Sequence, residues 1–299
     1  MTVAIIDAFA SPTIYRDAKT YADRNDPAHP LKGRQFSQFV FPINHALEGP
    51  NECDAAGWYG EETLDVEAVH VMAPGAHILY VGGSDCQEVS LDKALNEVVS
   101  KSLAQIVSNS YGDLGVPSPD FSASSPWVTA VGGTTPGIGA DGRKTFETGW
   151  EAGKSVLADG VWTPAGPGAY VYGSGGGTSL ASPLFAGMMA LADDVSGVHH
   201  GFINPTLYQR LAGSQAITDI KHTKGAVIRV DYLNGVDAAD GLVTSARTLD
   251  FGGLAIKTAR GYDDVTGLGV PNGMHSSSSG SHGAASGRQK RACGSTRNE

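Results

Sequence analysis

Nearly continuous apolar runs, each ending in small or polar residues, recur along the chain. They are Thr2–Asp7 (TVAIID), His77–Gly83 (HILYVGG), Ile106–Gly112 (IVSNSYG) and Trp127–Gly133 (WVTAVGG). Runs of this length and character are typical of strands buried on both faces of a parallel sheet. We therefore expect the four segments to be strands of one mostly parallel sheet.

Segments with helical spacing lie between these runs. Residues 61–73 are periodic and are followed by Pro74 and Gly75, which end a helix. Residues 18–24 and 91–102 also have the spacing of helices. The apolar side of the helix at 61–73 is expected to consist of Leu64, Ala68, Val71 and Met72. Strands that alternate with helices predict an α/β fold.

The alternation breaks at one place. No helical segment separates Tyr111 from Trp127, although neighbouring parallel strands need a crossover of about a dozen residues or more. We infer that one helix–strand unit is missing, and that the domain is incomplete between residues 112 and 121.

Ser179 lies between a glycine run and an apolar helix. Gly175–Gly177 precede it, and Leu180–Ala192 are mostly apolar, with Pro183 in the expected first turn. A serine there lies beside free backbone N–H groups and the positive end of a helix dipole, where negative charge is stabilised during acyl transfer. Ser179 is thus a candidate nucleophile; the alternative is a helix N-cap.

Glu61 and Asp65 are four residues apart, so a helix projects both carboxylates from one face. Like charges at this spacing repel, and two carboxylates that share a proton are one reason to keep them together. The alternative is an acidic first turn that the helix dipole favours. Asp7, at the end of the first expected strand, is either a further site candidate or a turn residue.

Composition excludes several classes of protein. The chain has 299 residues, ample for a buried core, and a net charge of -10, which argues against nucleic acid as a partner. No apolar run approaches the ~20 residues of a membrane helix. Met1 is followed at once by a strand-like run, so we expect no signal peptide in this sequence.

Three cysteines, at positions 53, 86 and 293, fit no zinc spacing. Cys53 and Cys86 either pair in an oxidising compartment or remain buried free thiols. Cys293 lies in the segment 274–299, where serine, glycine and basic residues predict a disordered low-complexity tail outside the folded domain at 1–273.

Several motifs together resemble the sedolisin family, the serine-carboxyl peptidases. Gly177–Pro183 (GTSLASP) is similar to the nucleophile motif, and Glu61-x-x-x-Asp65 followed by Ala73-Pro74-Gly75 is similar to the acid helix. Residues 123–134 are also similar, and the resemblance runs from Thr2 to Gly273. It implies a subtilisin-like α/β fold with helices on both faces of the sheet.

The resemblance also implies an activity. Ser179 would be the nucleophile, Glu61 the general base and Asp65 its support, in a secreted, monomeric endopeptidase that cleaves polypeptides at acidic pH. The substrate cleft would be lined by Ser110, Tyr111, Gly112, Gly132 and Gly133.

One structural calcium ion is a further implication of the resemblance. The matching positions are Asp219, Ile220, Ala259, Gly261 and Asp263. Ala259 stands where the family commonly has glycine, and it still offers a carbonyl oxygen. Hard oxygen ligands of this kind suit Ca²⁺.

The sequence departs from the family in its oxyanion motif. Sedolisins carry an aspartate in a Ser-Gly-Asp-Ser-Gly-like turn, and neither Asp113 nor Asp120 matches it. The sequence opens on the first expected strand, so we expect no pro-region in it, although family members are made with one. The first alternative is therefore a catalytically impaired or inactive remnant that binds extended peptides by strand addition. The second is an ordinary subtilase with an Asp/His/Ser triad, although none of the nine histidines stands in a His-Gly-Thr setting.

Overall fold

The computed structural model describes residues 1–112, 123–138, 144–149, 154–158, 161–165, 178–221, 232–233, 236–237, 245–246 and 258–272. Three segments that carry expectations lie outside the described residues. They are the glycine run 175–177, residues 113–122 with Asp113 and Asp120, and the tail with Cys293. The expectations placed on them stay predictions.

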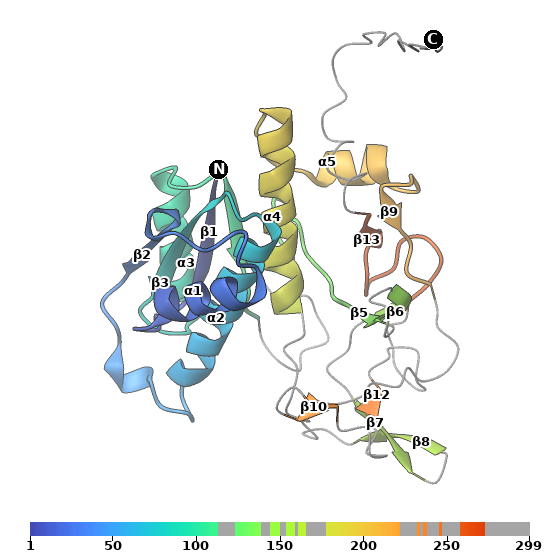
Figure 1. Cartoon of the computed structure of the whole chain (residues 1–299), viewed down its shortest axis with the longest axis horizontal. Coiled ribbons are helices and arrows are strands. Elements are labelled where there is room, and N and C mark those ends of the chain that lie inside the picture. The colour runs from blue at the N-terminus through green and yellow to red at the C-terminus, as the bar shows by residue number, and fades with distance from the viewer. Residues whose placement is uncertain are drawn as a thin grey trace, which may run out of the picture.

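Four parallel strands form the sheet that carries the site (Figure 1). They are β1 (Thr2–Ala8), β2 (Phe36–Val40), β3 (His77–Gly83) and β4 (Ile106–Asn109), in the order β2-β3-β1-β4. β1 pairs with β3 along its whole length and with β4 from Val3 to Ile6. Three of the four predicted strands are confirmed, and β4 is the last strand of this sheet in the described part of the chain.

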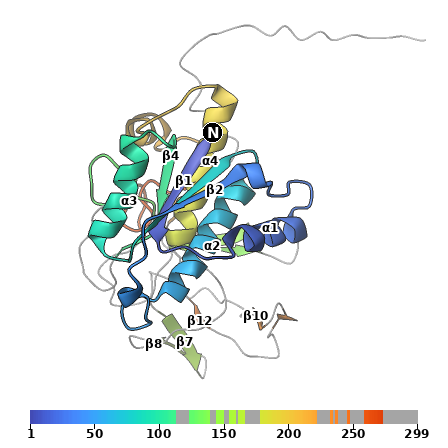
Figure 2. The same ribbon diagram turned by 90° about the vertical axis from the view of Figure 1, so that its left-hand side faces the viewer.

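Helices cover both faces of the sheet, as predicted (Figure 2). Val3 and Ile5 of β1 pack with α1 (Ile14–Asn25), α2 (Ala55–Met72) and α4 (Thr178–Ser196). Ala4 and Ile6 face the opposite side and pack against α3 (Glu88–Ser100). Successive residues of a strand point to opposite faces, so an apolar run without alternation fits a sheet covered on both sides.

The predicted strand at Trp127–Gly133 is wrong. Residues 123–133 form turns and irregular backbone, and strand β5 begins only at Thr134. Thr129 donates its hydroxyl proton to Asn204 Oδ1 at 2.6 Å, and Asn204 Nδ2 donates to the carbonyl oxygen of Val128 at 2.9 Å. The segment therefore satisfies part of its polar groups against the start of α5, not in the parallel sheet. Trp127 is 80% exposed.

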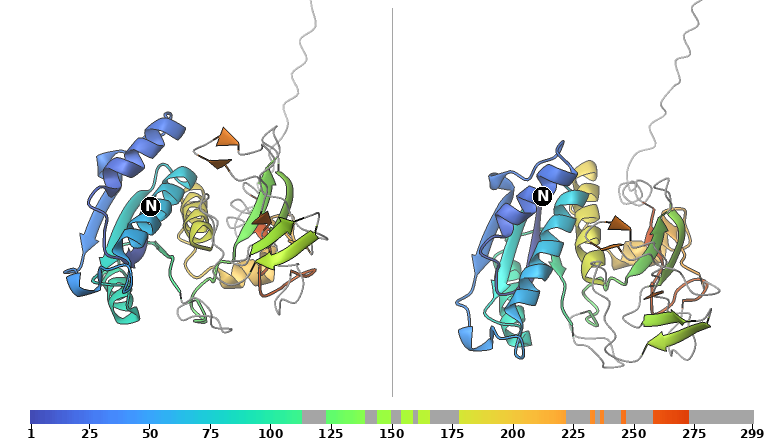
Figure 3. Two further views of the ribbon diagram at one scale, coloured as in Figure 1. Left: turned by 90° about the horizontal axis from the view of Figure 1, so that it is seen from below. Right: turned by 60° about the horizontal axis from the view of Figure 1, so that its bottom comes forward.

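The remaining strands are short and antiparallel. They are β5 (Thr134–Ile138) with β6 (Lys144–Gly149), β7 (Lys154–Ala158) with β8 (Val161–Ala165) and β12 (Ser245–Ala246), β10 (Tyr232–Leu233) with β11 (Val236–Asp237), and β9 (Ile217–Thr218) with β13 (Val270–Pro271). Short helical turns are η1 (Gly33–Gln35), η2 (His45–Leu47), α5 (Asn204–Thr206) and η3 (Leu207–Leu211). The views in Figure 3 place α4 between the parallel sheet and these strands.

Cys53 and Cys86 form a disulfide, with their Cα atoms 5.5 Å apart. Of the two alternatives left open by the sequence, the structure selects the pair. The bond joins the residue before the N-cap of α2 to the loop between β3 and α3. It therefore fixes the N-terminal end of the acid-bearing helix to the sheet.

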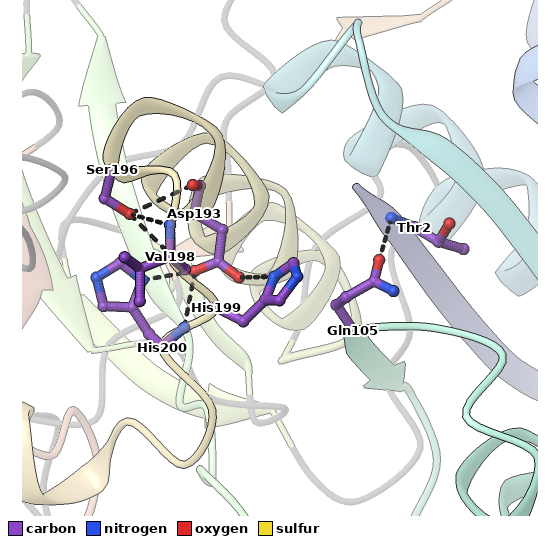
Figure 4. Close-up of polar contacts among 7 residues, drawn as sticks. All are labelled: Thr2, Gln105, Asp193, Ser196, Val198, His199 and His200. Carbon is purple, nitrogen blue, oxygen red and sulfur yellow. Dashed lines mark hydrogen bonds and ion pairs between the residues drawn. The ribbon is translucent and has the colours of Figure 1, made fainter.

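The C-terminal end of α4 is held by a buried carboxylate (Figure 4). Asp193 Oδ1 lies 2.5 Å from His200 Nδ1 and accepts the backbone N–H of His200 at 3.2 Å. Asp193 Oδ2 lies 3.4 Å from His199 Nδ1. These contacts fold the chain back onto the last turn of α4.

In the part of the chain that the structure describes, no helix is long and apolar enough to cross a bilayer.

Candidate active site

Glu61 and Asp65 lie near the middle of α2, one turn apart on the same side. The helix begins at Ala55, more than a turn before Glu61. The acidic-first-turn interpretation is therefore wrong, because the dipole effect is confined to the first turn. The expected apolar side needs correction too: Val71 is 48% exposed, whereas Asp65 is fully buried.

Ser179 is the second residue of α4, and its side chain is hydrogen-bonded to Glu61. Burial raises the pKa of Glu61 above its ordinary value, and the hydrogen bond from Ser179 lowers it in part. α4 is longer than the predicted helix and places Pro183 in its interior. A hydroxyl beside a half-buried carboxylate is the contact that proton abstraction requires.

Close packing of α2 on α4 keeps these two groups together. A Cβ on Gly187 of α4 would lie 2.7 Å from Met72 Cβ and 3.3 Å from the carbonyl oxygen of Val69. Only a glycine lets the two helices approach this far without displacing Met72. The contact lies two turns along α4 from Ser179, so it sets the spacing between the serine and the acid pair.

Ser110 follows β4 and joins the acid pair to α4. Its hydroxyl donates to Asp65 Oδ2 at 2.7 Å and lies 3.3 Å from the backbone carbonyl oxygen of Ser179. Burial raises the pKa of Asp65 well above its ordinary value; the hydrogen bond from Ser110 acts in the opposite direction, and Glu61 raises it further. Ser110 is 7% exposed, so its side chain faces the acids.

Two more carboxyl groups lie behind the pair. Asp7, at the end of β1, is fully buried, and neither of its carboxylate oxygens has a hydrogen-bond partner among the described residues. Burial raises its pKa well above the ordinary range, and Asp65, Glu61 and Glu62 raise it further. Asp7 was a candidate from its place at a strand end, and the structure brings it to the acid pair.

Glu62 is the member of this cluster that sequence reasoning missed. It is fully buried and accepts the backbone N–H of Ser11. Burial raises its pKa to about 8, although the hydrogen bond from Ser11 lowers it. The sequence signal that could have found it is the pair of adjacent glutamates, Glu61 and Glu62. The spacing argument considered only Glu61, because it lies four residues from Asp65.

The other predicted cleft residues have different surroundings. Tyr111 is partly buried and packs against two apolar clusters, while Gly112 is exposed. Gly132 abuts the segment 258–272: a Cβ on Gly132 would lie 2.5 Å from the carbonyl oxygen of Val265. Gly133 is buried. Of the two expected edges of the cleft, the one at Tyr111 contacts apolar clusters, whereas the one at Gly132 contacts the backbone of Val265.

The expected calcium positions gather around one turn. Asp219 Oδ2 accepts the N–H of Gly261 at 3.0 Å, and Asp219 Oδ1 is buried without a hydrogen-bond partner. Asp263 accepts the N–H of Ala259 at 3.0 Å and further backbone N–H groups. Ile220 is buried beside Asp219. The orphaned oxygen of Asp219 fits a hard cation.

Carbonyl oxygens would have to complete that ligand set. In the described ranges, no group of three or more His, Cys, Asp or Glu side chains could hold a metal.

The acid-bearing helix α2 carries one histidine, His70. His70 is buried on α2, and its Nε2 lies 2.9 Å from the backbone carbonyl oxygen of His29. The group beside the Ser179 hydroxyl is a carboxylate. Ser179, Glu61, Asp65 and Ser110 thus form one hydrogen-bonded and electrostatically coupled unit.

Known proteins share both sequence and fold with this chain. It is 31% identical over 195 residues to the tripeptidyl-peptidase SED4 of Arthroderma otae, covering 52% of this chain and 30% of that protein. It is 39% identical over 107 residues to the tripeptidyl-peptidase sed4 of Aspergillus fumigatus, covering 33% and 16%. The chain therefore spans less than a third of these relatives. No family model matches it.

The structure of Pseudomonas sedolisin, a serine-carboxyl proteinase complexed with two molecules of pseudo-iodotyrostatin, has the same fold. The superposition gives a TM-score of 0.61 over 93% of this chain and 91% of that chain, at 20% sequence identity. The predicted subtilisin-like α/β fold is confirmed. The chain is thus similar in sequence to these tripeptidyl-peptidases, and it shares its fold with sedolisin.

Proposed function

We propose that this chain is a serine-carboxyl peptidase with Ser179 as nucleophile, Glu61 as general base and Asp65 as the supporting acid. The observation that carries the proposal is the hydrogen bond between the Ser179 side chain and Glu61. Glu61 takes the hydroxyl proton as the Ser179 oxygen attacks the substrate carbonyl. It then returns that proton to the leaving amine, which leaves an acyl group on Ser179 for water to hydrolyse.

Asp65 sets the charge on this base. Two carboxyl groups one turn apart in a buried site release their protons jointly. With one proton on the pair, Glu61 is ionised next to Ser179 while Asp65 stays neutral. At lower pH both groups are protonated and no base remains. At higher pH both groups are ionised, and the two like charges repel. Activity at acidic pH follows from a pair that works with one shared proton.

The substrate is a polypeptide, and the mode of attack is open to a direct test. Internal cleavage was expected from the resemblance, whereas the relatives are named tripeptidyl-peptidases. An endopeptidase cleaves peptides whether or not the N-terminus is blocked. A tripeptidyl-peptidase needs the free amine. Paired free and N-acetylated peptides, analysed by mass spectrometry, distinguish the two.

A calcium ion near the C-terminal segment is the second part of the proposal. Carboxylates of Asp219 and Asp263, with carbonyl oxygens of Ile220, Ala259 and Gly261, would hold one ion. The ion would neutralise the charge of these carboxylates and fix the 259–261 turn. Secretion and a monomeric state belong to the same proposal, and the Cys53–Cys86 disulfide is typical of an oxidising compartment.

The alternative is a peptide-binding remnant with impaired catalysis. It is favoured by the missing family aspartate, because losing an oxyanion donor typically costs ~10²–10³ in rate. Purified chain and a Ser179→Ala variant, assayed on unfolded casein across acidic pH, separate the two. Turnover by the wild type alone supports the peptidase. Equal rates, with peptide binding retained, overturn it in favour of the remnant.

A further inference from the structure

Pro183 removes a hydrogen-bond donor from the first turns of α4. In an α-helix the N–H of residue i+4 bonds to the carbonyl oxygen of residue i, and Pro183 is the i+4 residue of Ser179. Proline has no N–H. The carbonyl oxygen of the nucleophile therefore lacks its helical donor and needs a partner from another element.

Ser110, the residue directly after β4, reaches that oxygen. Its Oγ atom is 3.3 Å from the Ser179 carbonyl oxygen and 2.7 Å from Asp65 Oδ2. Ser110 is thus a single side chain between the supporting acid and the backbone of the nucleophile. Being 7% exposed, it is shielded from the surface that a substrate would contact.

We propose that Ser110 is a positioning residue that links Asp65 to the backbone of Ser179, and that it does not bind substrate. The proposal rests on the roles given above to Ser179 and Asp65. The Ser110 hydroxyl has one proton, so it can donate to only one of its two contacts at a time. Which contact receives the proton depends on whether Asp65 is ionised. When Asp65 is ionised, the proton points to Asp65 Oδ2. When Asp65 carries a proton, Asp65 donates to Ser110 Oγ, and the Ser110 proton turns to the Ser179 carbonyl.

No covalent bond changes in this exchange, and no proton leaves the site. The consequence is that the first turns of α4 are tied most tightly when Asp65 is protonated, as it is in the state with one proton on the acid pair. The groups that face Asp65 are Glu61 on its own helix, Asp7 on β1 and Tyr80 on β3. An ionised Glu61 or Asp7 acts against a second negative charge in the site, whereas Tyr80 is neutral and donates its hydroxyl proton to the carbonyl oxygen of Phe9 at 3.0 Å.

Ser108 of β4 provides a matched control for Ser110, which directly follows that strand. It is 1% exposed and lies two residues before Ser110. Its Oγ atom is 3.0 Å from Ser182 Oγ on α4. A Ser108→Ala change therefore removes a part-buried hydrogen bond to α4, as Ser110→Ala does. It leaves the contact to Asp65 in place.

The test is a carboxyl ¹³C NMR titration of Asp65 in the full chain, with Ser110→Ala, Ser108→Ala and the wild type. Losing a hydrogen bond to a carboxylate should raise the Asp65 midpoint by about one pH unit in Ser110→Ala. Ser108→Ala should leave it within ~0.3 unit, the range expected for a site without direct contact. An unchanged midpoint in Ser110→Ala, or the same shift in both variants, overturns the proposal.

Kinetics provide the second readout and separate this inference from the proposed function. If the wild type turns over peptides, Ser110→Ala should lower kcat about tenfold with KM unchanged, because a ~1.4 kcal/mol loss is tenfold in rate. Ser110→Thr, which keeps the hydroxyl, should recover most of it. A rise in KM alone would assign Ser110 to substrate binding and overturn the proposal. Without wild-type turnover the peptidase proposal fails, and the titration still decides the role of Ser110.

Discussion

The side chain of Ser179 on α4 is hydrogen-bonded to Glu61 on α2, although the two residues are far apart in the sequence. The bond depends on packing between two helices on one face of the sheet. It combines a hydroxyl near a helix N-terminus with a carboxylate whose pKa is raised by burial. Neither segment has this arrangement by itself.

Glu61→Gln should strongly slow peptide cleavage while leaving the fold intact. Glutamine has the shape of glutamate and can still bond to Ser179, but it cannot accept the hydroxyl proton. We expect kcat to fall by ~10²–10⁴, the usual contribution of general acid–base catalysis. The measurement is kcat across acidic pH, with circular dichroism to confirm folding.

The pH profile provides the control for that result. Burial raises the pKa of Glu61, so wild-type activity should decline as pH falls through a value above the ordinary glutamate range. Residual activity in Glu61→Gln should lose this acidic limb. If the variant kept both the rate and the limb, Glu61 would not be the base.

Gly187→Ala should loosen the contact between α2 and α4. The added Cβ would lie 2.7 Å from Met72 Cβ, and forcing a methyl group into a packed site typically costs ~1–3 kcal/mol. Gly60→Ala on α2 is the matched control, because nothing lies within 4 Å of a Cβ there. That change should stabilise the protein by ~0.5–1 kcal/mol. Urea unfolding of the two variants measures both effects, and equal stabilities would contradict the packing argument.

Calcium should stabilise the wild type through the orphaned oxygen of Asp219. A ligand at 100 times its Kd adds about 2.7 kcal/mol to the free energy of unfolding. Thermal unfolding with Ca²⁺ should therefore show a higher Tm than with chelator, and Mg²⁺ at the same concentration should have less effect. Asp219→Asn keeps the bond to Gly261 but removes the charge, and it should abolish the difference. A Ca²⁺ shift of equal size in Asp219→Asn would place the ion elsewhere.

Local sequence pattern was sufficient where burial is uniform. β1, β3 and β4 lie between helical layers, so their apolar runs identify them directly. The run at Trp127–Gly133 looks the same in sequence, yet Trp127 is exposed. A strand needs a neighbour to pair with, and an apolar run does not carry that information.

The acid pair was found from its spacing, but its surroundings were not. Helix α2 starts earlier than the Glu61 segment suggested, because Ala55 packs into the cluster around the Cys53–Cys86 disulfide. Glu62 lies next to Glu61 in sequence, and only the position of Ser11 after β1 explains why it is buried. The contacts of Ser110 depend on where α4 docks, which no single segment encodes.

Glu62 should make the protein less stable as pH rises. Its pKa is raised from 4.5 to about 8 in the folded chain by burial, so between these values the folded chain holds a proton that the unfolded chain has released. The contribution of Glu62 to the free energy of unfolding is therefore largest below the ordinary glutamate pKa. This contribution is lost as pH rises toward 8. We expect a decline on the order of a few kcal/mol across this window.

Glu62→Gln isolates this contribution, because the amide is neutral at every pH and its oxygen can still accept the Ser11 N–H. Its free energy of unfolding, from urea titrations between pH 4 and 8, should decline less steeply than that of the wild type. Glu52→Gln, at an exposed position, controls for the general loss of one negative charge and should retain the wild-type slope. Asp7 and Asp65 also have raised pKa values, so part of the slope must survive in Glu62→Gln. If the free energies of unfolding of Glu62→Gln and the wild type changed with pH in parallel, Glu62 would be ionised in the folded chain. Its charge would then be stabilised by the Ser11 N–H.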